Sequence, residues 1–435
     1  MFENINFDYE RSRRLFKEGF WIVLGQIMLV LGSLVGVRIL TGLMMPSEYG
    51  ELALGMTVAT LVNQGVMGPL GNGVTRFYAP AVERADFGGY LKAVLRLVLS
   101  ASGGIVFLFL IVVVGLLIVG KVQWLGIALA ATMYAILSGN NSILNGIQNA
   151  ARQRSVVALH QGIEPWSRFL IAAGLMVALG ATSTVAMAGY VIAVILILVS
   201  QYLFFYKVVP PNMDETDEGT KWSTQIFNFS WPFAAWGIFT WAQLVSDRWA
   251  LGIFGTMEEV GMYAVLFQLG YYPISMVTGM AMQFLAPIFY QRAGDASDSK
   301  RNTDVKKMSW LLGCSVLGVT LFAFLIVFFS HAYLFHLFVA KEYASVSYLL
   351  PWLILSGGIF AAGQTISLDL MSQMKTNSMV APKIITALGG GILNFVGAYL
   401  FGIKGIVFAN VIFSASYFIW MILISRRYFG ELVAA

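Results

Sequence analysis

Long apolar segments separated by short polar stretches run through the chain from residue 20 to residue 424. A helix needs about 20 mainly apolar residues to cross a bilayer, and each segment approaches or exceeds that length. No segment alternates with the period of two that a membrane barrel requires, so we expect helices. The pattern predicts twelve spans, at residues 20–45, 49–68, 93–119, 125–145, 156–179, 185–206, 229–254, 260–286, 308–329, 346–371, 380–401 and 406–424.

One long polar stretch divides these spans into two sets of six. It covers residues 207–228 and contains two adjacent prolines and an acidic run at 214–218. We therefore predict three parts: an N-terminal six-helix bundle at 1–206, a cytoplasmic linker at 207–228, and a C-terminal six-helix bundle at 229–435.

The two halves share a repeated pattern, in which an arginine inside an apolar run is followed by an acidic turn. Residues 38–53 read RILTGLMMPSEYGELA and residues 248–264 read RWALGIFGTMEEVGMYA, so that Arg38 aligns with Arg248. Further on, FYAP and RAD in the first half match FLAP and RAGD in the second. The repeat predicts two pseudo-symmetric bundles, an arrangement in which carriers commonly place the substrate site between the halves.

Composition agrees with a membrane protein. Of the 435 residues 58% are hydrophobic and 11% are charged, with a mean hydropathy of +0.76, whereas soluble domains carry about 25% charged residues. The net charge of +5 does not indicate nucleic-acid binding, because the basic residues lie between apolar segments. The single cysteine, Cys314, can form no intrachain disulfide, and we expect it to pack in the core.

The distribution of basic residues predicts the orientation in the membrane. Of the 27 lysines and arginines, 21 belong to the termini, to the loops that alternate spans place on one side, or to the span ends beside these loops. The opposite loops hold only Lys121, Lys341 and Lys404, and the remaining three arginines lie farther inside spans. Because basic loops stay in the cytoplasm, we predict that both termini and the linker are cytoplasmic.

Charged residues inside the spans are the first candidates for function, because each costs about 2.5–3.5 kcal/mol to insert and usually faces a partner or a cavity. Glu164 and Arg168 are four residues apart, so they can pair on one helix face, with either a structural or a functional role. Asp247 and Arg248 are about 100° apart around a helix, so we expect them to point in different directions. The six candidates are Arg38, Glu164, Arg168, Asp247, Arg248 and Asp369.

Two further features bear on function. The run GPLGNG at residues 68–73 is expected to break the second helix shortly before Arg76. Arg38 could extend its charged end to the membrane surface, but the recurrence of an arginine at the equivalent position 248 favours a cavity.

The three histidines lack metal-site spacing, and no phosphate loop or catalytic triad occurs. We therefore expect no metal, no cofactor and no enzymatic activity.

Four segments carry a resemblance to a known family: RILTGLMMPSEYG at 38–50, GVTRF at 73–77, SDRWALGIFG at 246–255 and VGMYA at 260–264. The chain resembles the polysaccharide transporter branch of the multidrug/oligosaccharidyl-lipid/polysaccharide (MOP) exporter superfamily, which includes O-antigen flippases. The resemblance implies an all-α membrane protein with about 12 transmembrane helices. It also implies a flippase that moves an undecaprenyl-diphosphate-linked oligosaccharide across the inner membrane for lipopolysaccharide or other surface polysaccharide assembly.

The resemblance also implies roles for particular residues. It fits Arg38, Arg76 and Arg248 as substrate-binding residues, since the planar guanidinium suits a diphosphate. Other charged residues are candidates for coupling or ion pairing: Asp247, Glu164, Arg168 and Asp369. Implied partners are the lipid-linked glycan, membrane lipids, a glycan polymerase and export machinery, with no nucleic acid.

Two alternatives stay open at this point. One is a cation-coupled multidrug exporter of the same superfamily. Many drug exporters use an aspartate in the first span, but the first span of this chain contains no acidic residue after Glu18. A membrane enzyme of glycan assembly is the other, although the outer loops are short for a catalytic site.

Overall fold

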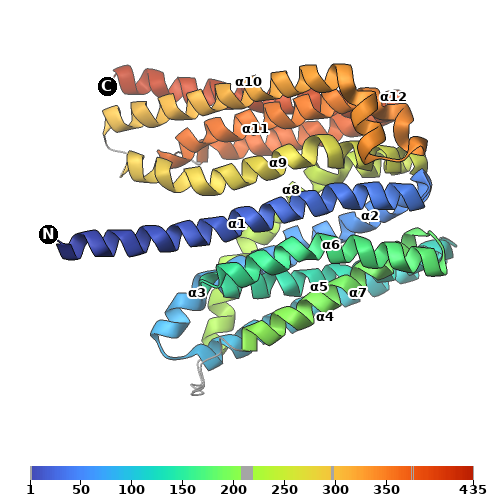
Figure 1. The fold of residues 1–435 in the computed structure, drawn as a ribbon, viewed down its shortest axis with the longest axis horizontal. Helices are drawn as coiled ribbons and strands as arrows, with labels where there is room; N and C mark the ends of the chain where they lie inside the picture. Colours follow the sequence, from blue (N-terminus) through green and yellow to red (C-terminus); the bar gives the residue numbers. More distant parts are fainter. Residues whose placement is uncertain (1, 207–218, 295–297, 374, 376, 435) are drawn as a thin grey trace. The chain divides into compact units, whose positions relative to one another are not determined.

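The computed structural model describes residues 2–206, 219–294, 298–373, 375 and 377–434, and these residues are almost entirely helical (Figure 1). Most of the predicted linker, residues 207–218, lies outside the described part. Contacts group the chain into two compact units: Met1–Met44 with Glu51–Trp241, and Met45–Gly50 with Ala242–Ala435.

The first unit is a bundle in which α6 packs against both α1 and α7, and α7 also packs against α5. The indole of Trp222, near the start of α8, donates to the buried carboxylate of Asp86 at 2.6 Å. Trp241 donates to the carbonyl of Thr57 at 2.8 Å. These bonds attach the first part of α8 to this unit. Its helices are α1 (Phe2–Leu43), α2 (Pro46–Val62, from Glu51), η1 (Asn63–Met67), α3 (Gly68–Glu83), α4 (Phe87–Ile118), η2 (Val122–Trp124), α5 (Leu125–Ala150), α6 (Arg154–Leu179), α7 (Ser183–Tyr206) and the start of α8 (Gly219–Phe254).

In the second unit α11 is the central helix, because it packs against α9, α10 and α12. Residues of α11 are buried along almost the whole length of the helix. The α12 helix is interrupted at Gly402, whose φ of 58° is open to glycine but not to most residues. The unit contains the end of α8, α9 (Met257–Ala293), α10 (Ser299–Phe338), η3 (Lys341–Leu349), α11 (Leu350–Ser372) and α12 (Asn377–Ala434).

The helices have the length and composition of membrane spans. Within the described residues nine helical segments are long and apolar enough to cross a bilayer. The last of them, Ser378–Arg427, contains both of the final two predicted spans, which meet at Gly402. The prediction of an all-α membrane protein is therefore confirmed.

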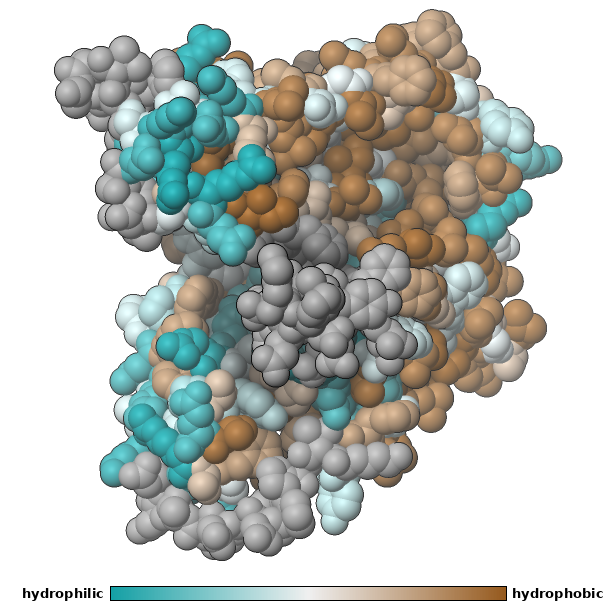
Figure 2. All heavy atoms as spheres, turned by 60° about the vertical axis from the view of Figure 1, so that its left-hand side comes forward, coloured by the Kyte–Doolittle hydropathy of each residue, from teal (hydrophilic) through white to brown (hydrophobic). Residues whose placement is uncertain are grey.

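The most apolar helix of each unit faces outward. In the best 18-residue window of α4 only 6% of residues are buried, and in that of α10 only 17%. On the face drawn in Figure 2, hydrophobic residues cover a band between hydrophilic residues that gather toward the helix ends. Cys314 is exposed on α10, so the prediction that it packs in the core is wrong. Lipid is the neighbour that such surfaces require.

Polar residues at loops start several of these helices. Thr256 and Glu259 form a capping box at the start of α9, with Thr256 Oγ1 accepting from the Glu259 amide at 3.2 Å and Glu259 Oε2 accepting from the Thr256 amide at 3.0 Å. Asp86 accepts from the Gly89 amide at the start of α4, and Asp298 accepts from two amides at the start of α10. The acidic turn in the second copy of the repeat thus begins α9.

The sequence pattern predicted a break in the second helix at residues 68–73, and this prediction is wrong. Instead, α2 continues into the π-helix η1, and α3 follows directly, with Pro69 in its first turn. The Gly68 amide donates to the Asn63 carbonyl five residues earlier, and this wider turn accommodates the proline that lacks its own donor. Arg76 therefore lies on a helix and not after a break.

The two copies of the repeat meet at equivalent glycines, within the second unit. A Cβ on Gly50 would overlap the carbonyl oxygen of Met257, and a Cβ on Gly261 would overlap that of Pro46. Gly50 aligns with Gly261 in the repeat, and Pro46 aligns with Met257, so the contact is reciprocal. Tyr49 reinforces it by donating to Gln268 Oε1 at 3.0 Å. The starts of α2 and α9 thus cross at backbone contact.

This crossing gives a stability prediction. Gly50→Ala or Gly261→Ala places a methyl group against backbone that cannot move aside, so either change should lower the free energy of unfolding by about 1–3 kcal/mol. Gly42→Ala is the matched control, because nothing lies within 4 Å of its added Cβ. Thermal unfolding of the purified variants measures the effect. Unfolding of Gly261→Ala at the wild-type temperature would contradict the close crossing.

Candidate functional site

A buried carboxylate organises the polar contacts of the second unit. Asp247 on α8 is 2% exposed, so its oxygens need hydrogen-bond partners. Its Oδ2 accepts from the Tyr263 hydroxyl on α9 at 2.5 Å, and its Oδ1 accepts from the Arg248 amide at 2.7 Å. Asn410 on α12 donates to the same hydroxyl at 3.0 Å. The carboxylate is thereby held by a chain of bonds across three helices.

Arg248 is bound to this carboxylate as well. Its Nη1 lies 3.5 Å from Asp247 Oδ1 and donates to the Leu244 carbonyl at 3.2 Å, and its guanidinium lies 4.5 Å from the centre of the Phe267 ring. The prediction that the two side chains point apart is therefore wrong, because the long arginine side chain folds back along the helix. An anion that binds Arg248 must compete with Asp247 for it.

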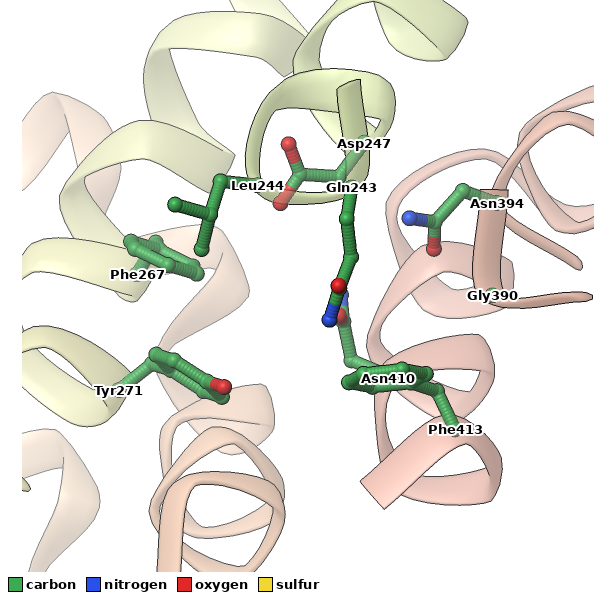
Figure 3. Close-up of a pocket in the computed structure, with 9 residues that line it drawn as sticks. All are labelled: Gln243, Leu244, Asp247, Phe267, Tyr271, Gly390, Asn394, Asn410 and Phe413. Carbon is green, nitrogen blue, oxygen red and sulfur yellow. The ribbon is translucent and has the colours of Figure 1, made fainter. Parts of the chain in front are cut away.

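A small cavity lies beside the carboxylate (Figure 3). About 20 Å³ is open to the centre of a water molecule, enough for roughly one water. Asn394 lines it with a buried Oδ1 that has no partner among the described residues, while its Nδ2 donates to Ser246 Oγ at 2.9 Å. Gln243 and Asn410 also line the cavity, and Figure 3 draws both side chains. These oxygens could hold one water or one small cation.

The first unit contains a second charged cluster, which joins three helices. Arg168 Nη1 lies 3.2 Å from Glu164 Oε1, so the two residues pair as their spacing predicts. The Tyr134 hydroxyl on α5 accepts from the same nitrogen at 3.0 Å. The guanidinium lies about 5 Å from the rings of Phe169 and Tyr190, at 4.9 Å and 5.0 Å. This cluster resembles that of Asp247 in composition, with a carboxylate, an arginine and a tyrosine hydroxyl.

The other predicted site residues are placed differently. Arg38 lies in the last turns of α1 and Arg76 on α3, and both are exposed residues of the first unit. Asp369 on α11 is buried and accepts from Gln373 at 2.5 Å and from Ser425 at 3.0 Å. The bond from Ser425 holds the end of α11 against α12.

Sequence reasoning missed the polar partners of these charges. Tyr263, Asn394 and Asn410 complete the Asp247 site, and Tyr134 completes the Glu164 cluster. A signal was present, since Asn394 and Asn410 are amides inside predicted apolar spans. Such groups need a buried partner as charges do.

Comparison with known proteins gives a family and a fold. The sequence profile of a family described as polysaccharide biosynthesis protein matches residues 10–292. No curated protein matches the sequence with significance. Solved structures of similar fold include an inward-facing multidrug resistance MATE family transporter of the MOP superfamily, with a TM-score of 0.63 and 14% identity over 94% of this chain and 96% of that one.

Two further structures are similar. The lipid II flippase MurJ in its inward closed conformation has a TM-score of 0.65 and 13% identity, over 94% of this chain and 87% of that one. The Vibrio cholerae MATE transporter VcmN in its bent form has a TM-score of 0.54 and 14% identity, over 96% and 97%. At these identities the likeness establishes the fold alone.

Proposed function

The chain belongs to the polysaccharide biosynthesis protein family, and we propose that it flips an undecaprenyl-diphosphate-linked oligosaccharide across the cytoplasmic membrane during assembly of a surface polysaccharide. Its family and its MOP fold are those of transporters and not of enzymes. One structure of similar fold is a flippase for lipid II, and this supports flipping as the mode of action.

The observation that carries the proposal is the recurrence of an arginine in an apolar helix at equivalent places of the two halves, Arg38 and Arg248. An arginine inside a membrane is costly, so such residues are rare and usually have a function. A diphosphate offers several anionic oxygens, which guanidinium groups bind in pairs. We propose that Arg38, Arg76 and Arg248 bind this group while the prenyl chain stays in lipid.

The Asp247 contacts suggest how binding is coupled to movement. A diphosphate that takes Arg248 removes the ion-pair partner of a carboxylate that is 2% exposed. A buried carboxylate without a counter-charge is unstable, so a proton or a small cation must enter the adjacent cavity. Substrate and cation then both break the Asp247–Arg248 ion pair, so the binding of one favours the binding of the other. Glu164 with Arg168 is the corresponding ion-pair candidate of the first unit.

The proposed orientation places both termini and the linker in the cytoplasm, from the excess of basic residues in one set of loops. We propose that the glycan moves from the inner to the outer leaflet, the direction that the family resemblance implies. The glycan polymerase and the export machinery would then receive it outside the membrane.

Reconstitution tests the function. Purified protein in liposomes should move lipid-linked oligosaccharide, extracted from cells that lack this protein, between leaflets faster than protein-free liposomes do. A cationic dye serves as the second substrate, because the MATE structures share the fold. Movement of the dye without movement of the lipid-linked oligosaccharide would overturn the flippase proposal in favour of a multidrug exporter.

A further inference from the structure

The second unit contains another and larger cavity, between α9 and α11, which lie side by side (Figure 1). Its volume is about 280 Å³, whereas a protein cavity of roughly 150 Å³ already takes up benzene. It shares no lining residue with the cavity beside Asp247. It therefore has room for a six-membered ring that carries substituents.

One face of each helix lines this cavity. Ser275, Thr278 and Gly279 come from α9, and Phe360 and Gln364 come from α11. The spacing of three and four residues places each set on a single helix face. None of the lining residues is charged, so the cavity is not suited to a diphosphate.

The polar groups of the lining are available to a ligand. The side-chain amide of Gln364 has two donor hydrogens and one acceptor oxygen. Within the described residues this side-chain amide makes no hydrogen bond, and only the backbone carbonyl of Gln364 accepts one from another side chain. Ser275 is an exposed residue. The Thr278 hydroxyl donates to the Ile274 carbonyl at 2.7 Å, which leaves its oxygen able to accept a bond. An uncharged ligand with several hydroxyl groups would satisfy these positions.

The apolar part of the lining consists of Met282, Ala361 and the ring of Phe360, which packs against other rings. Phe360 stacks on Phe413 at 5.6 Å and lies 4.9 Å from Tyr417, measured between ring centres. Gly279 on the facing helix has no side chain, and nothing lies within 4 Å of where its Cβ would be. The cavity thus combines a fixed aromatic ring, open space and free polar groups.

We propose that this cavity binds one neutral sugar ring of the transported glycan, an inference that rests on the proposed flippase function. A pyranose has apolar C–H faces, which suit Phe360, and hydroxyl groups, which suit Gln364, Ser275 and Thr278. A prenyl chain would leave the Gln364 amide without a partner when it displaced water, and this disfavours it. The glycan is then recognised at a place separate from the arginines.

The test uses variants that fill or depolarise the cavity without disturbing the fold. Gly279→Leu puts a side chain into the open space, and leucine favours a helix more than glycine does. Gly318→Leu on α10 is the matched control, since it also meets nothing within 4 Å and does not line the cavity. Gln364→Leu removes the amide and keeps a side chain of similar size.

Binding is measured by saturation-transfer NMR on the full chain in lipid nanodiscs, with methyl glycosides of glucose, galactose, mannose, rhamnose and N-acetylglucosamine as probes. Wild type and Gly318→Leu should bind at least one glycoside, and Gly279→Leu should bind none. Gln364→Leu should weaken binding by roughly two- to tenfold, the effect of losing neutral hydrogen bonds.

Failure of this inference is distinguishable from failure of the flippase function. If wild type binds no glycoside, or if Gly279→Leu binds as wild type does, the sugar site is overturned, even where liposomes show flipping of lipid-linked oligosaccharide. If the glycosides bind in the predicted pattern but the liposomes show no flipping, the flippase function fails and the cavity stands as a sugar site.

Discussion

Arg38→Ala and Arg248→Ala should each abolish export of the glycan while the protein remains folded and inserted in the membrane. The diphosphate must lose water to enter the protein, and charge-assisted bonds from arginine replace that water. Each such bond contributes about 1.5–3 kcal/mol, so the loss of one should weaken binding by roughly 10- to 150-fold. Surface glycan and accumulated lipid-linked intermediate measure the effect in cells, with protein level determined in parallel.

Two further variants define the chemistry. Lysine at either position should restore export only in part, because an ammonium keeps the charge and loses the planar pair of donors. Arg96→Ala is the control, since Arg96 is an exposed arginine on α4 that none of the candidate sites uses. Full export with lysine at both positions would show that charge alone suffices.

Asp247→Asn should separate substrate binding from transport. Asparagine keeps the shape of the side chain but releases Arg248 from its ion pair, which frees the guanidinium for the diphosphate. We therefore expect tighter binding of a soluble analogue such as farnesyl diphosphate, by about tenfold, a gain of about 1.4 kcal/mol. Export should be lost, because the variant has no carboxylate to rebind Arg248 and release the substrate.

Asp369→Asn is the matched control for this prediction, since Asp369 is a second buried carboxylate of the same unit. It should leave the affinity for farnesyl diphosphate unchanged. Tyr263→Phe removes one bond to Asp247 and should lie between wild type and Asp247→Asn in both measurements. If Asp247→Asn binds the analogue as weakly as Arg248→Ala does, Asp247 only positions the arginine, and the exchange mechanism is wrong.

Much of the fold was predictable because membrane helices have a simple sequence signature. Each hydrophobic segment must satisfy its own backbone hydrogen bonds in lipid, so length and hydropathy define a span. The pattern failed where local geometry decided the outcome. The turn at Asn63–Met67 widens into a π-helix, and this kept the helix continuous ahead of Pro69. No periodicity in the sequence signals such a widening.

The candidate site was only half predictable, for a related reason. The cost of charge in lipid identifies Asp247 and Arg248 from the sequence alone. Tyr263 lies 16 residues from Asp247, and Asn410 lies 147 residues from Tyr263. Their contacts depend on how α8, α9 and α12 pack, which an apolar pattern does not specify. The residues of the proposed sugar-binding cavity are likewise common in apolar helices, and the sequence does not show that the two helix faces lie together.

The most direct test of the anionic head-group mechanism is the flipping rate of an Arg38→Ala, Arg248→Ala double variant in liposomes. The substrate is lipid-linked oligosaccharide from cells that lack this protein, and Arg96→Ala is measured beside it. The mechanism predicts that the double variant flips no faster than protein-free liposomes, while Arg96→Ala keeps the wild-type rate. A double variant that flips the lipid-linked oligosaccharide at the wild-type rate would contradict it.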